Sequence, residues 1–281
     1  MSAADFLQTD ELGFGGRPDK RLIGRSFGAA AARYDGLADL QRTVGEKLLA
    51  RLSSVNLAPA RIADVGAGTG YLGTRLIQLY PKADLLALDI AEGMLRFARS
   101  RCGNSGAVRF VCGDAEAMPF RDRSIDLVFS NLTIQWCSGF NTVFREIRRI
   151  LRPDGVTLFS TFGAETLKEL RSAWASVDDY SHVNCFGGSS AVMSALQEAG
   201  FTEIEVGIET HRLTYASVYD LMRELKGLGA HNVTLGRPRH LTGKGTLQRM
   251  VAAYERQAGG DGIPASFEVI YGFARGPVEC P

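Results

Sequence analysis

Three alternating glycines follow a short apolar run near residue 65, where the chain reads Asp-Val-Gly-Ala-Gly-Thr-Gly over residues 64–70. The apolar run, 62–65, is partly β-branched and has the composition of a buried parallel strand. Glycines directly after such a strand let the chain turn sharply and bring its backbone against a ligand, where a Cβ would collide. A helix beginning near Tyr71 would present its N-terminal N–H groups to the same ligand. This segment predicts an α/β fold that binds a nucleotide-like cofactor.

Carboxylates close the next two strand-like runs. Asp89 ends the run 84–88, nineteen residues after the last glycine, where nucleotide-binding folds place a carboxylate that hydrogen-bonds the ribose hydroxyls. Asp114 and Ala115 follow the run 107–112, where a carboxylate and a backbone N–H can bind an adenine ring. A capped surface turn would explain this third feature alone. Because Gly-x-Gly-x-Gly leaves less room for a pyrophosphate than Gly-x-Gly-x-x-Gly, the three together favour S-adenosyl-L-methionine and resemble the class I methyltransferases.

Strand-like runs alternate with helical patterns between Arg61 and Phe162, which predicts a doubly wound parallel sheet. The helix before the fifth strand is expected to stop at Pro-Asp-Gly, residues 153–155. The class I resemblance implies a Rossmann-like seven-stranded sheet with an antiparallel last strand, N-terminal helices and a helical lid. The expected parts are a flexible leader at 1–20, an N-terminal helical cap at 21–55, and a methyltransferase domain at 56–281 with its lid at about 213–257. The last two strands are expected at 203–210 and 267–273.

Charge and cysteine content narrow the class of partner. The formal net charge is +1 and no basic run exceeds two residues, which disfavours a nucleic acid as the partner. The five cysteines form no Cys-x-x-Cys pair, so neither a metal site nor a disulfide framework is indicated. No apolar run has membrane-spanning length, and acidic residues near the start argue against a secretory signal. These features predict a cytoplasmic protein without a membrane partner.

Four segments resemble the malonyl-acyl-carrier-protein O-methyltransferases of biotin synthesis. They are 27–42, 130–137 (Ser-Asn-Leu-Thr-Ile-Gln-Trp-Cys), 166–174 with 182–186, and 225–230 (Leu-Lys-Gly-Leu-Gly-Ala) with 241–248. The resemblance covers about residues 24–274. Residues 161–163 and the lid also resemble a mitochondrial complex I assembly factor that hydroxylates a protein arginine. A protein arginine hydroxylase is therefore one alternative, and an assembly factor that binds S-adenosylmethionine without catalysis is another.

The malonyl family implies a methyl transfer from S-adenosylmethionine to the free carboxylate of a malonyl thioester. This carboxylate is ionised at pH 7 and needs no general base, which fits the lack of a Ser-His-Asp or paired-carboxylate pattern. The partner is then an acyl carrier protein bearing a malonyl group, or malonyl-coenzyme A. The predicted cofactor-binding residues are Asp64, Gly66, Gly68, Gly70, Asp89, Ile90, Met94, Asp114, Ala115 and Asn131.

The acceptor side is predicted from the same resemblance. The candidates are Tyr34, Gln135, Arg171, His182 and Lys226, with Arg171 as the expected clamp on the malonyl carboxylate. Four of them also have a structural alternative: packing for Tyr34, a solvated helix face for Arg171 and Lys226, and a structural loop contact for His182. Two basic clusters could dock an acidic carrier protein, Arg145, Arg148, Arg149 and Arg152 on one helix, or Arg237, Arg239, Lys244 and Arg249 beside the lid.

Overall fold

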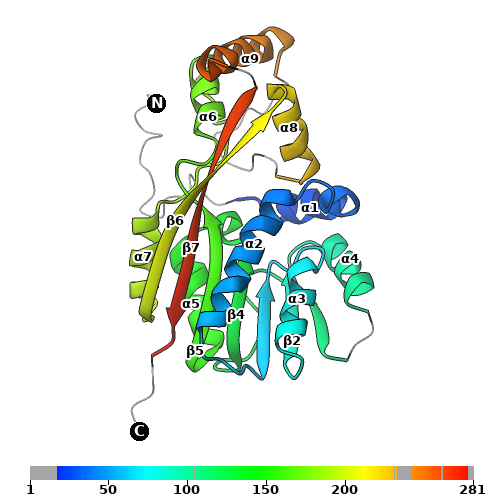
Figure 1. Cartoon of the computed structure of the whole chain (residues 1–281), viewed down its shortest axis with the longest axis vertical. Helices are drawn as coiled ribbons and strands as arrows, with labels where there is room; N and C mark the ends of the chain where they lie inside the picture. The colour runs from blue at the N-terminus through cyan, green and yellow to red at the C-terminus, as the bar shows by residue number, and fades with distance from the viewer. Residues whose placement is uncertain (1–17, 104–105, 231, 233–241, 261, 278–281) are drawn as a thin grey trace.

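Seven strands form one mixed sheet in the order β3-β2-β1-β4-β5-β7-β6, with helices on both faces (Figure 1). The computed structural model describes residues 18–103, 106–230, 232, 242–260 and 262–277. The strands are β1 (Arg61–Val65), β2 (Asp84–Asp89), β3 (Val108–Cys112), β4 (Ile125–Asn131), β5 (Leu151–Phe162), β6 (Thr202–Tyr215) and β7 (Ile263–Arg275). The helices are α1 (Lys20–Tyr34), α2 (Asp39–Arg51), α3 (Tyr71–Leu79), α4 (Glu92–Cys102), α5 (Phe140–Ile150), α6 (Lys168–Ala175), α7 (Ser189–Glu198), α8 (Val218–Gly227) and α9 (Lys244–Ala258), with short 3-10 turns η2 (Leu52–Ser54) and η3 (Ile134–Trp136).

The strand order confirms the predicted doubly wound sheet. β1 pairs in parallel with both β2 and β4, so the chain reverses its direction of travel across the sheet at β1. In open α/β sheets, ligands bind outside the carboxyl ends of the strands at such a point. β7 pairs antiparallel with β5 and β6, as the class I resemblance implies. The sheet therefore places a binding site at the ends of β1, β2 and β4.

Two element boundaries differ from the prediction. α5 ends at Ile150 rather than at the Pro-Asp-Gly turn, because Leu151 already pairs with Ile125 on β4. The next described pair after a register shift is Leu127 with Val156, so residues 152–155 bulge out of the ladder and carry Asp154 at φ 59°. A bulge accommodates a proline that a regular ladder would exclude. β6 and β7 are also longer at both ends than the predicted 203–210 and 267–273.

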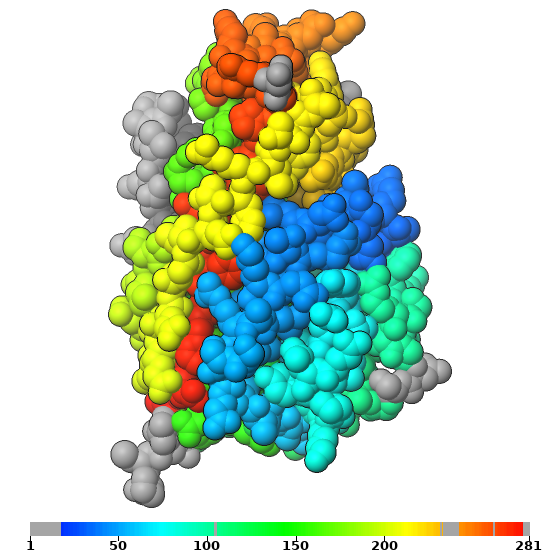
Figure 2. Space-filling view, in the orientation of Figure 1, coloured from blue at the N-terminus to red at the C-terminus, as the bar shows by residue number. Residues whose placement is uncertain are grey.

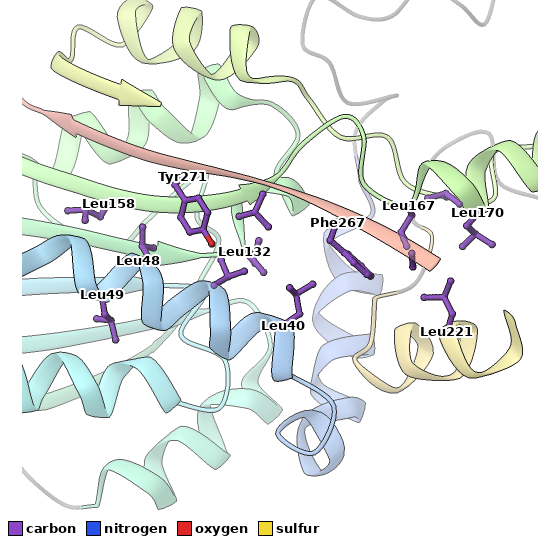
Figure 3. Packing of buried hydrophobic residues seen from close by; sticks show 14 of the residues in the cluster. Leu40, Leu48, Leu49, Leu132, Leu158, Leu167, Leu170, Leu221, Phe267 and Tyr271 are labelled. Atoms are coloured by element: carbon purple, nitrogen blue, oxygen red, sulfur yellow. The ribbon is translucent and has the colours of Figure 1, made fainter. Parts of the chain in front are cut away.

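One apolar cluster joins the sheet to the neighbouring helices (Figure 3). Leu40 and Leu48 of α2, Leu221 of α8, and Phe267 and Tyr271 of β7 all belong to this cluster. All five side chains are at most 7% exposed. Burial of a large apolar side chain stabilises a fold by about 1.5–3 kcal/mol. The packing of α2 and of the predicted lid in this cluster therefore stabilises the sheet as well.

In the sequence, the helices of the predicted lid lie between β6 and β7, which are neighbouring antiparallel strands in the sheet. β5 pairs with β7 only as far as Val269, whereas β6 and β7 continue together to the pair Tyr215–Ile263. This two-stranded extension carries α8 and α9 at its end, beside α6 (Figure 1). No helix among the described residues is both long and apolar enough to cross a membrane. The expected leader falls largely on residues 1–17, outside the described residues.

Candidate active site

A cavity opens at the carboxyl ends of β1, β2, β3 and β4, roofed by α1. Its empty volume is about 670 Å³. The predicted residues that line it are Tyr34, Gly66, Gly68, Asp89, Ile90, Met94, Asp114, Ala115 and Asn131. The others that line it are Lys20, Ile23, Phe27, Leu88, Gly113, Leu132, Thr133, Trp136 and Cys137. No described residue of 213–257 appears in this lining, so the roof comes from the N-terminal helix rather than from the predicted lid.

The glycine loop forms the floor of this cavity. Gly66 has φ 79° and a Cβ there would lie 1.9 Å from the Thr133 hydroxyl oxygen. Gly68 has φ 55°, with no atom within 4 Å of a Cβ built on it, although it lines the cavity. The space above Gly68 is therefore available for close approach of a ligand to the backbone. Gly70 lies behind the loop, where a Cβ would meet Ala98 of α4 at 2.9 Å.

Asp89 ties the loop to the end of β2. Its Oδ2 accepts from the Gly68 N–H at 2.9 Å, and its Oδ1 accepts from the Ala91 N–H at 2.7 Å. Burial raises the pKa of Asp89, while the N–H groups of Ala91 and Gly68 oppose that shift. The side chain is only 9% exposed, yet it lines the cavity, and each carboxylate oxygen has a second lone pair. Asp89 can therefore accept from ribose hydroxyls without releasing the loop.

Asp64 is a buried carboxylate with an unpartnered oxygen. It is 2% exposed, and its Oδ2 has no hydrogen-bond partner among the described residues. It does not line the cavity but lies under the loop, 3.3 Å from a Cβ built on Gly73 of α3. Burial, then the Asp89 carboxylate, raises its pKa to about 7. An orphaned carboxylate beside a glycine cradle fits a cofactor that brings positive charge, as S-adenosylmethionine does.

Asp64→Asn is expected to stabilise the free protein at alkaline pH. The folded pKa of about 7 lies above the ordinary aspartate value of 3.8, so between these two pH values the folded state keeps a proton that the unfolded chain releases. Wild-type stability therefore falls as pH rises across this range. The penalty is on the order of 4 kcal/mol above pH 7 and vanishes below pH 4. Thermal melting of both proteins from pH 4 to 8 measures it. Calorimetry should show weaker S-adenosylmethionine binding by the variant, and pH-independent identical melting would contradict the assignment.

The far end of the cavity is closed by an ion-pair cluster that the sequence analysis missed. Lys20 Nζ lies 2.8 Å from Asp114 Oδ1 and also pairs with Glu116, whose carboxylate accepts from the Ser138 N–H. Lys20 begins α1, although it is the last residue of the expected leader. The Asp19 side chain caps this helix by accepting from two backbone N–H groups. An aspartate directly before a helical pattern is the signal that would have moved the boundary.

Tyr34 is the acceptor candidate that the structure brings to the cavity. Its ring makes an edge contact with Phe27, which in turn contacts Trp136 at 5.2 Å between centroids. No hydrogen bond is formed by its hydroxyl among the described residues. Burial, then the Asp89 carboxylate, raises the pKa of Tyr34, so the hydroxyl stays protonated and can donate. An unpartnered neutral donor beside an aromatic wall suits an anionic acceptor.

Two other acceptor candidates make structural hydrogen bonds to backbone carbonyls. Arg171 donates to the Ala164 carbonyl at 2.6 Å and to the Thr166 carbonyl at 3.3 Å, which fixes the segment before α6. Gln135 is buried and donates to the Leu132 carbonyl at 2.7 Å. Neither side chain lines the cavity. The clamp role of Arg171 stays a prediction.

His182 and Lys226 also lie outside the cavity lining. The His182 ring stacks on Trp174 at 3.6 Å between centroids and lies 2.8 Å from an Asp178 carboxylate oxygen. Lys226 lines a separate depression on the outer side of α1. His182 packs on α6 and Lys226 belongs to α8, so their acceptor roles stay predictions too.

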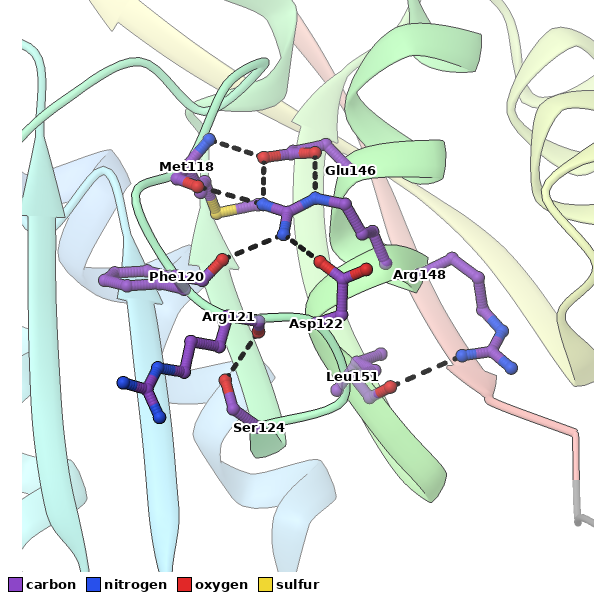
Figure 4. A network of polar contacts seen from close by, with 9 residues as sticks. Met118, Phe120, Arg121, Asp122, Ser124, Glu146, Arg148 and Leu151 are labelled. Carbon is purple, nitrogen blue, oxygen red and sulfur yellow. Dashed lines mark hydrogen bonds and ion pairs between the residues drawn. The ribbon is translucent and has the colours of Figure 1, made fainter.

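The first predicted docking cluster is largely paired within the molecule. Arg149 binds Glu146 and Asp122 and donates to the carbonyls of Met118 and Phe120 (Figure 4). Arg152 pairs with Asp126 at 2.7 Å, and Arg148 donates to the Leu151 carbonyl. Of the second cluster, residues 237 and 239 lie outside the described residues, and Arg249 donates to Thr246.

The fold and the strand-end site define a class I S-adenosylmethionine-dependent methyltransferase. A family model described as a methyltransferase domain matches residues 63–159. Among solved structures, the YcgJ protein of Bacillus subtilis has a TM-score of 0.60 at 17% identity, covering 83% of this chain and 99% of that one, which shows the shared fold. S-adenosylmethionine is thus the cofactor that the three strand-end features predicted.

Relatives of high sequence identity show which family within this class the chain belongs to. A malonyl-acyl-carrier protein O-methyltransferase from Methylococcus capsulatus is 50% identical over 258 residues, which cover 92% of this chain and 94% of that protein. A biotin biosynthesis bifunctional protein from Cellvibrio japonicus is 45% identical over 253 residues, 90% of this chain and 49% of that protein. This chain belongs to the malonyl-acyl-carrier protein O-methyltransferase family. These relatives give no support to the arginine hydroxylase alternative.

Proposed function

We propose that this protein methylates the free carboxylate of a malonyl group carried by an acyl carrier protein, at an early step of biotin synthesis in the cytoplasm. The observation that carries the proposal is the cavity itself. It joins the strand-end cofactor residues to Tyr34, whose neutral hydroxyl is unpartnered among the described residues. The relatives named for this reaction support the choice of acceptor.

The chain's own residues account for binding and orientation. Asp89 would accept from the ribose hydroxyls, Asp114 with the Ala115 N–H would bind the adenine, and Gly68 would let the ligand approach the backbone. Bound S-adenosylmethionine supplies an electrophilic methyl group. Tyr34 would donate to the acceptor carboxylate and turn one of its oxygens toward that group. No proton has to be removed, because the carboxylate is already ionised.

The charge balance explains why a neutral donor suits the acceptor. The positive sulfonium and the negative carboxylate both lose their charge as the methyl group is transferred. A strong cationic clamp would therefore stabilise the reactants more than the transition state. The remaining effect is alignment in a water-poor cavity, which can lower a barrier by about 7–11 kcal/mol. Phe27 and Trp136 provide an apolar wall that helps to exclude water from the cavity.

The direct test uses malonyl-carrier protein and S-adenosylmethionine labelled in its methyl group. We expect mass spectrometry to show a gain of one CH₂ on the prosthetic arm, with the label in the product ester. A boiled sample and acetyl-carrier protein are the controls. A gain of oxygen on a protein arginine, or cofactor binding without any methylated product, would contradict the proposal in favour of one of the two alternatives.

Tyr34→Phe is expected to lower kcat/KM for malonyl-carrier protein roughly 10- to 100-fold, because a hydrogen bond to a charged group contributes about 1.5–3 kcal/mol. Affinity for S-adenosylhomocysteine should not change. Tyr71→Phe is a matched control, since that hydroxyl donates to Glu46 away from the cavity. Steady-state kinetics and calorimetry measure both. Normal kinetics for Tyr34→Phe, together with a raised KM for Arg171→Ala, would show that Arg171 rather than Tyr34 binds the malonyl carboxylate.

A further inference from the structure

A second hollow lies between α1 and α8, on the outside of the molecule. The open space over it, solvent included, is about 550 Å³. Arg25, Ser26, Ala29, Ala30 and Arg33 of α1 line it together with Lys226 of α8. In the space-filling view the blue surface of α1 lies directly beneath the yellow surface of α8 (Figure 2). We call this hollow the basic depression.

The basic depression and the cofactor cavity lie on different sides of one helix. Ile23, Phe27 and Tyr34 line the cavity, whereas Arg25 and Arg33 line the depression. At about 100° per residue, the first three lie within roughly 40° of one another, while Arg25 lies about 160° and Arg33 about 80° around the helix from Ile23. The two spaces are therefore separated by part of α1, a helix about 10–12 Å in diameter.

The cations of the basic depression have no ion-pair partner among the described residues. Arg25, Arg33 and Lys226 are exposed, and none forms an ion pair or hydrogen bond with another part of the chain that the structure describes. The nearby carboxylates already have partners, since Asp35 pairs with Arg101 and Glu224 accepts from Tyr215. Ser26 and Ala29 are small, which leaves room between the cations. The depression is therefore a local positive site on a chain of net charge +1.

We propose that the basic depression binds the phosphate of the phosphopantetheine arm that carries the malonyl group. This inference rests on the proposed function. Arginines bind phosphate oxygens in pairs, and the three cations converge on one hollow. A long flexible arm anchored in the depression has to pass only around part of α1 before its thioester reaches the cavity. α1 would then set the distance between the anchored phosphate and the reacting carboxylate.

The experiment compares malonyl-pantetheine, which has no phosphate, with malonyl-phosphopantetheine and malonyl-carrier protein as acceptors. The variant is the double change Arg25→Gln and Arg33→Gln. Lys82→Gln is the matched control, because Lys82 is exposed in the turn before β2 and has no partner among the described residues. We expect wild type to favour the phosphorylated arm over malonyl-pantetheine by about tenfold in KM, and the double variant to lose this preference.

Turnover of malonyl-pantetheine and binding of S-adenosylhomocysteine should be the same in all three proteins. A double variant that keeps the wild-type KM for malonyl-phosphopantetheine would overturn the assignment. So would a loss confined to malonyl-carrier protein, which would place the contact on the carrier's own surface. Failure of the proposed function looks different, because wild type would then methylate none of the three acceptors.

Discussion

Asp89→Ala is expected to weaken S-adenosylmethionine binding roughly 30- to 160-fold, or about 2–3 kcal/mol, as measured by calorimetry. The buried carboxylate has two roles that this change removes together. It accepts from the Gly68 N–H and so holds the glycine loop, and its free lone pairs face the cavity, where the ribose would lie. The loss should appear in cofactor affinity before any effect on the acceptor.

Two further variants separate these roles. Asp89→Asn keeps one oxygen that can accept from Gly68, so it should preserve more affinity than alanine does. Asp84→Ala removes an exposed carboxylate from the opposite end of the same strand, where Asp84 pairs with Arg109 at 3.6 Å, and should leave affinity unchanged. If Asp89→Ala folds normally and binds the cofactor as wild type does, the ribose assignment is wrong.

We expect the acceptor site to discriminate even more strongly between acyl groups on the carrier protein. Acetyl-carrier protein lacks the nucleophilic carboxylate and should give no product. Succinyl-carrier protein keeps the carboxylate but places it one methylene further, which shifts the oxygen by about 1 Å or more. A shift of that size can lower the rate on the order of a hundredfold. Comparing kcat/KM for malonyl and succinyl substrates measures the effect.

Equal values for malonyl and succinyl substrates would mean that the cavity does not position the carboxylate. In the structure Phe27 and Trp136 form one wall of the cavity, with their rings in edge-to-face contact at 5.2 Å between centroids. Phe27→Ala should therefore relax the preference for malonyl while Leu79→Ala, an exposed leucine at the end of α3, should not.

The cofactor side was predictable because its signals are local. A few consecutive residues are enough to identify a glycine that needs a positive φ or a carboxylate at a strand end. The structure places Gly68, Asp89 and Asp114 in one cavity. The sheet followed from the same alternation of strand and helix. The ends of β6 were missed because its exposed residues lack the apolar run that marks a buried strand.

The acceptor side depends on packing between distant segments, which the sequence does not display. Nothing local shows that Arg171 bonds to two backbone carbonyls or that His182 stacks on Trp174. Likewise, Lys20 was assigned to a leader because its carboxylate partners lie some 94 residues away. Tyr34, which the family resemblance predicted, does line the cavity, where its ring contacts Phe27.

The pairing of Tyr215 with Ile263 makes residues 216–262 a replaceable module. Paired residues on antiparallel strands lie about 5 Å apart, so any insert whose two ends meet at that spacing can join β6 to β7 without changing the order of the sheet. Loop closure becomes only slowly more costly as an insert lengthens. Natural or engineered exchange of this module could therefore alter what packs against the outer face of α1 while the methyl-donor half of the protein stays intact.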